Sequence, residues 1–157
     1  SKYALPHLRK VKGSIVSIGS LASVMAQECG TIYCAAKAGI NGLTKSLAIE
    51  ESRFGVRVNI VLPGNIMSYG MLVAADARTD GDEWMNWLAS HQPSGRIGTI
   101  EEIGQLCLFL ASDAASYITG VEIIISSGSE LGYGVKYPLS SIKGKRTIAP
   151  TFLSSRA

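Results

Sequence analysis

Tyr33 and Lys37 are the two residues of this sequence whose types and spacing best suit proton transfer. Four residues apart on a helix, their side chains lie on one face, one turn from each other. An ammonium group close to a phenol favours the phenolate, so we expect Lys37 to ease the loss of the phenolic proton of Tyr33. Such a phenol can accept a proton from an alcohol or donate one to a carbonyl. The pair alone is not specific, because many surface helices carry a tyrosine and a lysine at this spacing.

Ser20 adds a third group to this pair. It stands thirteen residues before Tyr33 and directly after an alternating, β-branched run that predicts a strand. The carboxyl ends of strands are where α/β sheets bind ligands, and a hydroxyl there can stabilise charge that develops on a substrate oxygen. No G-x-S-x-G turn surrounds Ser17 or Ser20, which argues against a serine hydrolase. Serine, tyrosine and lysine therefore form a proton-transfer set that needs no histidine.

The elements expected around these residues alternate between strands and helices. The expected strands are residues 14–18, 56–62 and 121–125. The expected helices are residues 31–53, 82–90 and 99–111. Gly55 ends the first helix, and Thr99 with Glu102 predicts a capping box on the last. Residues 65–81 have weak periodicity, which predicts an irregular, mobile connection. This order of elements is typical of an α/β, doubly wound parallel sheet with flanking helices.

Composition narrows the class of protein. The chain has 157 residues, 46% hydrophobic and 17% charged, which suits one globular domain. A net charge of +3 is too small to indicate a nucleic-acid partner, and no apolar run is long enough to predict a membrane span. Three scattered cysteines, without a histidine at ligand spacing, favour reduced thiols in the cytoplasm over disulfides or a metal site.

At the motifs described above, the chain resembles the short-chain dehydrogenase/reductase family. The stretches that carry the resemblance are residues 13–20, Tyr33 with Lys37, and residues 55–59, 63–66, 95–98, 101–103, 109–112 and 118–120. The resemblance covers residues 1–134 and implies the C-terminal, catalytic part of a Rossmann-type domain. Residues 135–157 are then a basic tail, which we expect to be flexible because no aromatic or helical pattern accompanies its charges.

The resemblance implies a role for each member of the proton-transfer set. Ser20 orients the substrate, and Tyr33 is the general acid/base and also a cofactor-binding residue. Lys37 supports the tyrosine and holds the ribose of the nicotinamide. The implied cofactor is NAD, with NADP not excluded, because the residue that would select between them is not among the matching motifs.

The family also implies a nicotinamide site after the second strand. Pro63, Gly64 and Ile66 match the loop that cradles the nicotinamide ring. Ser68 stands where the family often has a threonine that contacts the carboxamide, and it keeps the hydroxyl.

Within the family, residues 130–134 resemble the enzymes that act on 17β-hydroxysteroids or L-fucose. Gln27, six residues before Tyr33, matches a pocket residue of that group. The implied substrate is a steroid or a sugar alcohol, and the implied assembly of the full-length protein is a homotetramer. Trp84 and Trp87 are candidates for a lid over the substrate, with packing of a short helix as the alternative.

The Gly-rich dinucleotide fingerprint is missing from the sequence. We therefore interpret the chain as partial and expect that, alone, it neither folds stably nor binds a dinucleotide. Two other functions stay open at this point. One is a non-catalytic truncated product that acts as an oligomerisation partner. The other is an NADPH-dependent 3-oxoacyl reductase, against which residues 130–134 argue.

Overall fold

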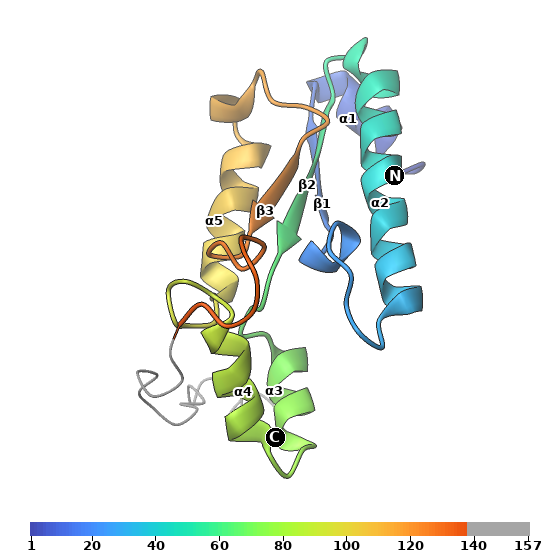
Figure 1. The fold of residues 1–157 in the computed structure, drawn as a ribbon. Helices are drawn as coiled ribbons and strands as arrows, with labels where there is room; N and C mark the ends of the chain where they lie inside the picture. The colour runs from blue at the N-terminus through green and yellow to red at the C-terminus, as the bar shows by residue number, and fades with distance from the viewer. Residues whose placement is uncertain (138–157) are drawn as a thin grey trace, which may run out of the picture.

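A parallel sheet of three strands, in the order β1-β2-β3, forms the centre of the computed structural model, which describes residues 1–137 (Figure 1). The strands are β1 Ser14–Ile18, β2 Arg57–Pro63 and β3 Glu122–Ile125. Ser14 pairs with Arg57, and Ile60 pairs with Glu122. All three strands therefore end at the same edge of the sheet, as the α/β prediction requires.

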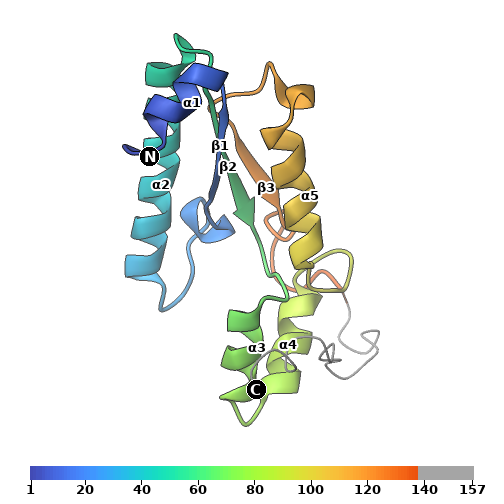
Figure 2. The same cartoon turned by 180° about the vertical axis from the view of Figure 1, so that it is seen from behind.

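Helices cover both faces of this sheet. The helical segments are α1 Leu5–Val11, η1 Leu21–Ser23, α2 Thr31–Ser52, α3 Tyr69–Asp76, α4 Gly81–Ser90, α5 Ile100–Ala111 and η2 Asp113–Ala115. Seen from opposite sides in Figures 1 and 2, α1 and α2 lie on one flank of the sheet and α5 on the other. The doubly wound arrangement is thus confirmed. Within residues 1–137, no helix combines the length and apolar character needed to cross a bilayer. Most of the tail expected at residues 135–157 lies outside the described residues.

The central strand β2 supplies the core on both faces. Val58, Ile60, Val61 and Leu62 are fully buried. Val58 packs in a cluster with Ala48 of α2, whereas Val61 packs with Leu110 of α5. Consecutive side chains of a strand point to opposite faces, so a continuous apolar run is what a strand covered on both sides requires.

Two helix ends follow the local sequence signals. Gly55, just after α2, has φ +73°, a left-handed conformation that glycine adopts without steric cost. At the start of α5, the Thr99 hydroxyl accepts the Glu102 N–H at 3.3 Å, and the Glu102 carboxylate accepts the Thr99 N–H at 2.8 Å. The capping box is therefore confirmed.

The expectation of an irregular connection over residues 65–81 is wrong for its central part. Residues 69–76 form α3, and the hydroxyl of Ser68 caps it by accepting the Met71 N–H at 3.3 Å. The helix escaped prediction because only Ala75 is buried, so the sequence shows little apolar periodicity. Ser68 as an N-cap was the available signal.

The pair α3–α4 has a small hydrophobic core of its own. Met85, Leu88 and Ala89 of α4 pack with Ala75 and Ile97, apart from the clusters that flank the sheet. The chain segment that contains α3 and α4 begins and ends at one place beside the sheet, where Ile66 and Gly98 form an isolated parallel bridge. Figure 1 shows the two helices beyond the ends of the strands.

Candidate active site

The first turns of α2 hold the predicted tyrosine and lysine. The Lys37 ammonium lies 5.8 Å from the centre of the Tyr33 ring, so the predicted juxtaposition on one helix face is present. The same ammonium donates to the Ile18 carbonyl at 3.2 Å. This bond fastens the helix to the carboxyl end of β1, two residues before Ser20. The Tyr33 ring is about half exposed, and its hydroxyl has no hydrogen-bond partner within residues 1–137.

Ser20 begins the short helical turn η1, with its backbone extended. Its hydroxyl oxygen accepts the Ala22 N–H at 3.2 Å. A serine hydroxyl can accept and donate at once, so its hydrogen is still available for a substrate oxygen. The backbone conformation therefore sets the direction of the Ser20 side chain without using up its donor.

Asn41 connects α2 to the loop of Ser20, a connection that the sequence reasoning missed. Its side-chain amide donates to the Ser23 hydroxyl at 3.0 Å, and Ser23 in turn donates to the Ser20 carbonyl at 2.6 Å. This chain of bonds links the loop of Ser20 to α2. The available signal was the spacing, because Tyr33, Lys37 and Asn41 follow one another at intervals of four on one helix face.

A hollow of about 150 Å³ opens beside Ser20 at the carboxyl ends of the strands. Its polar lining comes from Ser20, Gln27, Asn65 and Ser129, and Pro63 and Gly64 also line it. The structure thus brings together four residues predicted from the sequence: Ser20, Gln27, Pro63 and Gly64. Asn65 and Ser129 are additions that only the tertiary structure reveals.

The loop after β2, where the nicotinamide site was expected, has a rigidly held backbone. Gly64 donates its N–H to the Ile125 carbonyl at 3.0 Å, and a Cβ at Gly64 would lie 2.9 Å from the Cβ of Ser126. Ile66 is fixed by its bridge to Gly98. Ser68 accepts the Met71 N–H, which leaves its hydrogen free to donate to a carboxamide. The donor set of this loop therefore fits a nicotinamide, although Ile66 and Ser68 do not line the hollow beside Ser20.

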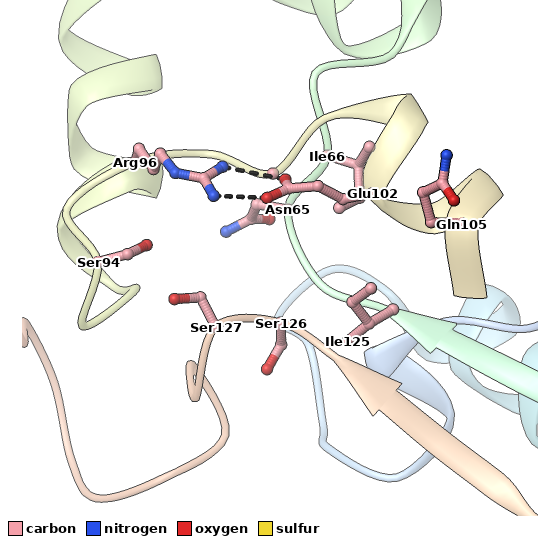
Figure 3. A pocket seen from close by; sticks show the side chains of 10 residues that line it. Asn65, Ile66, Ser94, Arg96, Glu102, Gln105, Ile125, Ser126 and Ser127 are labelled. Carbon is pink, nitrogen blue, oxygen red and sulfur yellow. Dashed lines mark hydrogen bonds and ion pairs between the residues drawn. The ribbon is translucent and has the colours of Figure 1, made fainter.

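A second, larger hollow of about 460 Å³ lies on the α5 side of the same loop (Figure 3). Arg96 spans the Glu102 carboxylate with two bonds of 3.0 and 2.5 Å. Those bonds and the Thr99 N–H lower the pKa of Glu102 to about 2. Ser127 lines the hollow from the other side, whereas Asn65 lies beside the Arg96–Glu102 pair, as Figure 3 shows. The sequence reasoning did not single out this hollow.

Trp84 and Trp87 lie on α4 and line a separate depression with Asp80 and Glu83. Trp84 packs against the α3–α4 core, with the Arg78 guanidinium 5.3 Å from its ring centre. Trp87 is half exposed, and its ring centre lies 4.3 Å from that of His91. Neither tryptophan lines the hollow beside Ser20. A lid role for them stays a prediction.

The chain combines a parallel sheet covered on two faces with a serine, a tyrosine and a lysine near the carboxyl edge of the strands. The family model described as Enoyl-(Acyl carrier protein) reductase matches residues 1–130, and the chain belongs to this short-chain dehydrogenase/reductase family.

Curated relatives are similar in sequence to this chain over most of its length. L-fucose dehydrogenase of Rattus norvegicus is 43% identical over 141 residues, which is 90% of this chain and 52% of that protein. The 7alpha-hydroxysteroid dehydrogenase of Clostridium sardiniense is 38% identical over 84% of the chain and 49% of that protein. The 3-oxoacyl-(acyl-carrier-protein) reductase of Haemophilus influenzae is 39% identical over 77% of the chain and 48% of that protein. The chain therefore spans about half the length of the curated relatives it matches.

Solved structures agree with the fold. The Cj0485 dehydrogenase superposes with a TM-score of 0.80 at 29% identity, over 84% of this chain and 51% of that one. ElxO, a structure with NADP bound, superposes with a TM-score of 0.74 at 31% identity, over 82% of this chain and 51% of that one. The Rossmann-type fold is thus confirmed.

Proposed function

We propose that the protein containing this chain transfers hydride between a nicotinamide dinucleotide and a secondary alcohol or the corresponding carbonyl. The observation that carries the proposal is the Lys37 ammonium, which lies close to the Tyr33 ring and donates to the Ile18 carbonyl. This lysine places a positive charge between the phenol and the strand end that presents Ser20. Such an arrangement suits a proton transfer coupled to the loss of hydride from carbon.

In the oxidative direction, the substrate loses a hydride from carbon and a proton from oxygen. Tyr33, in its phenolate form, accepts the proton and becomes the neutral phenol, and the Ser20 hydroxyl donates a hydrogen bond to the substrate oxygen. Lys37 stabilises the negative charge on the phenol oxygen while the proton is transferred. The dinucleotide, when bound, supplies the hydride acceptor, and Pro63, Gly64, Ile66 and Ser68 are the residues that would hold its nicotinamide. Reduction of a carbonyl follows the same steps in reverse.

For the substrate, we propose a secondary alcohol of the L-fucose or 17β-hydroxysteroid type. The names of the rat and clostridial relatives support a sugar or a steroid. The polar lining of the hollow by Ser20, Gln27, Asn65 and Ser129 favours the sugar. For the cofactor we propose NAD, and the ElxO structure supports NADP as the other candidate.

We further propose a cytoplasmic homotetramer. Large apolar side chains stand exposed on the outer faces of two helices. They are Ile32, Leu43 and Ile49 of α2, with Leu108 and Phe109 of α5. Exposed apolar surface of this kind marks contact with another chain, and self-association would cover it.

The test of the proposed reaction is Tyr33→Phe in the complete protein, assayed by NAD reduction with L-fucose and with estradiol. Removal of the proton acceptor is expected to lower kcat by a factor of about 10² to 10⁴, with the affinity for NAD unchanged. The matched control is Tyr117→Phe, because Tyr117 is fully exposed before β3, at the opposite end of the sheet. Unchanged turnover in the Tyr33 variant would refute the proposal. Reduction of an acetoacetyl thioester in preference to oxidation of both alcohols would indicate the 3-oxoacyl reductase instead.

A further inference from the structure

Ser129 has a buried hydroxyl that takes no part in the proposed proton or hydride transfer. Its Oγ is shielded from solvent and has no hydrogen-bond partner within residues 1–137. Ser129 also lines the hollow that Ser20 and Gln27 share. A buried polar group without a partner is rare in proteins, because burial removes the water that would otherwise satisfy it. A partner that enters through the hollow would remove this deficit.

The turn that presents Ser129 is held by its own hydrogen bonds. Ser126 donates its hydroxyl to the Glu130 carboxylate and accepts the Gly128 N–H at 3.1 Å. The Ser129 N–H bonds to the Ser126 carbonyl at 3.3 Å. These contacts fix the backbone on both sides of Ser129, so its side chain is preorganised and only its rotation about the Cα–Cβ bond is left to adjust.

The position of Ser129 relative to Gly64 places it across the hollow from Ser20. A Cβ at Gly64 would lie 3.3 Å from the Ser129 hydroxyl oxygen, so this hydroxyl lies next to the end of β2. Ser20 follows β1, and Ser129 follows β3, with β2 between them. Because neighbouring strands lie about 4.8 Å apart, the ends of β1 and β3 are separated by about 10 Å. Hydroxyls presented from the two outer strands of the sheet therefore suit two different oxygens of one ligand.

We propose that Ser129 binds a second oxygen of the substrate, distinct from the reacting oxygen that Ser20 contacts. The site then prefers a ring that carries several hydroxyls over a ring with one. This inference rests on the proposed function for the identity of the reacting oxygen, and it narrows the substrate class to polyhydroxylated secondary alcohols. Gln27 and Asn65 add further polar groups to the same lining.

The experiment is a ligand double-mutant cycle on the complete protein with NADH present, because the reduced cofactor cannot accept hydride and L-fucose is therefore bound without being oxidised. The binding of L-fucose and of its monodeoxy analogues is measured by calorimetry. Ser129→Ala is expected to raise the Kd for L-fucose about three- to tenfold, the usual worth of one neutral hydrogen bond. One analogue, the one lacking the contacted hydroxyl, should bind the wild type and Ser129→Ala equally. The matched control is Ser127→Ala, a change on the same turn at a residue that lines the other hollow.

The outcomes separate this inference from the proposed reaction. Four results would overturn the role of Ser129. Two concern the variants: an unchanged affinity for L-fucose in Ser129→Ala, or an equal loss of affinity in Ser127→Ala. Two concern the ligands: an equal loss of affinity with every analogue, or no binding of L-fucose to the wild type. Binding that depends on Ser129 without any oxidation of L-fucose would refute the proposed reaction alone. Oxidation of L-fucose with wild-type affinity in Ser129→Ala would refute the role of Ser129 alone.

Discussion

Buried and partly buried polar side chains at the two ends of the sheet differ in whether they have a hydrogen-bond partner. Where the strands begin, Arg57 donates to the Leu110 carbonyl at 2.6 Å, at the carboxyl end of α5. Asn59, fully buried, donates to the Ile118 carbonyl at 2.9 Å and accepts the Val121 N–H at 3.2 Å. Where the strands end, the buried hydroxyl of Ser129 has no hydrogen-bond partner within residues 1–137.

This difference separates groups that stabilise the fold from groups kept available for a ligand. A paired buried group adds a modest net stabilisation, whereas an unpaired one costs stability. Proteins depart from full hydrogen bonding mainly at functional sites. The comparison therefore assigns Arg57 and Asn59 to the scaffold, although both are polar and one is charged. It assigns Ser129 to the site.

The largest expected effect on stability comes from Asn59→Leu, at the beginning of the strands. The substitution leaves the Val121 N–H and the Ile118 carbonyl buried without partners, which should cost about 2–4 kcal/mol of the free energy of unfolding. Urea denaturation of the complete protein measures it. Turnover per folded molecule should stay at the wild-type value. Gln105→Leu, which changes an exposed amide on α5, is the control and should shift stability by less than about 0.5 kcal/mol. A loss of turnover larger than the loss of folded protein would contradict the division between the two ends.

A smaller effect on stability, with a larger effect on activity, is expected from Gly64→Ala at the other end. The new Cβ would lie 2.9 Å from the Cβ of Ser126, so the loop after β2 must move away from the turn after β3. Overpacking of this kind costs about 1–3 kcal/mol. We expect kcat/KM to fall further than the unfolding free energy accounts for.

Gly70→Ala is the matched control for that change. Its new Cβ would meet only the Ser68 hydroxyl, at 3.9 Å, inside helix α3. Alanine in a helix interior is favoured over glycine, so this variant should be as stable as the wild type or more so. Equal losses of kcat/KM in both glycine variants would show that Gly64 has no special relation to the site.

The smallest expected effect concerns Glu102, a paired charge near the end of the sheet where the strands end. Its pKa is lowered to about 2, mainly by the hydrogen bonds from Arg96. Because the pKa of Glu102 is lower in the folded state than its ordinary value of 4.5, the ionised carboxylate stabilises the protein at pH values above about 4.5. This contribution is lost as the pH falls from 4.5 towards 2. Glu102→Gln should therefore be less stable than the wild type at pH 7, and the difference should shrink at pH 3. Glu101→Gln, one residue earlier on the same turn, is the control. A difference that does not change with pH would contradict the role of the charge.

The sequence predicted local features well and tertiary ones poorly. The alternating residues at 14–18 define β1 in isolation, and Thr99 with Glu102 form a capping box that depends only on near neighbours. The spacing of Tyr33 and Lys37 fixes their shared face in the same way. By contrast, Ser129 and Gly64 meet only because β2 and β3 pair, and no spacing in the chain encodes that contact. Helix α3 was missed because it packs on α4 rather than on the sheet, with one buried residue to mark its period.

The bridge between Ile66 and Gly98 separates helices α3 and α4 from the sheet, and this affects how the chain can change in evolution. The Met67 N–H bonds to the Gly98 carbonyl at 2.8 Å, and the Gly98 N–H bonds to the Asn65 carbonyl at 3.0 Å. The thirty-odd residues between these points close into a loop with its own core. Insertions, deletions or wholesale replacement inside that loop need not be transmitted to the strands. Selection can therefore reshape α3 and α4 while the serine, tyrosine and lysine keep their places.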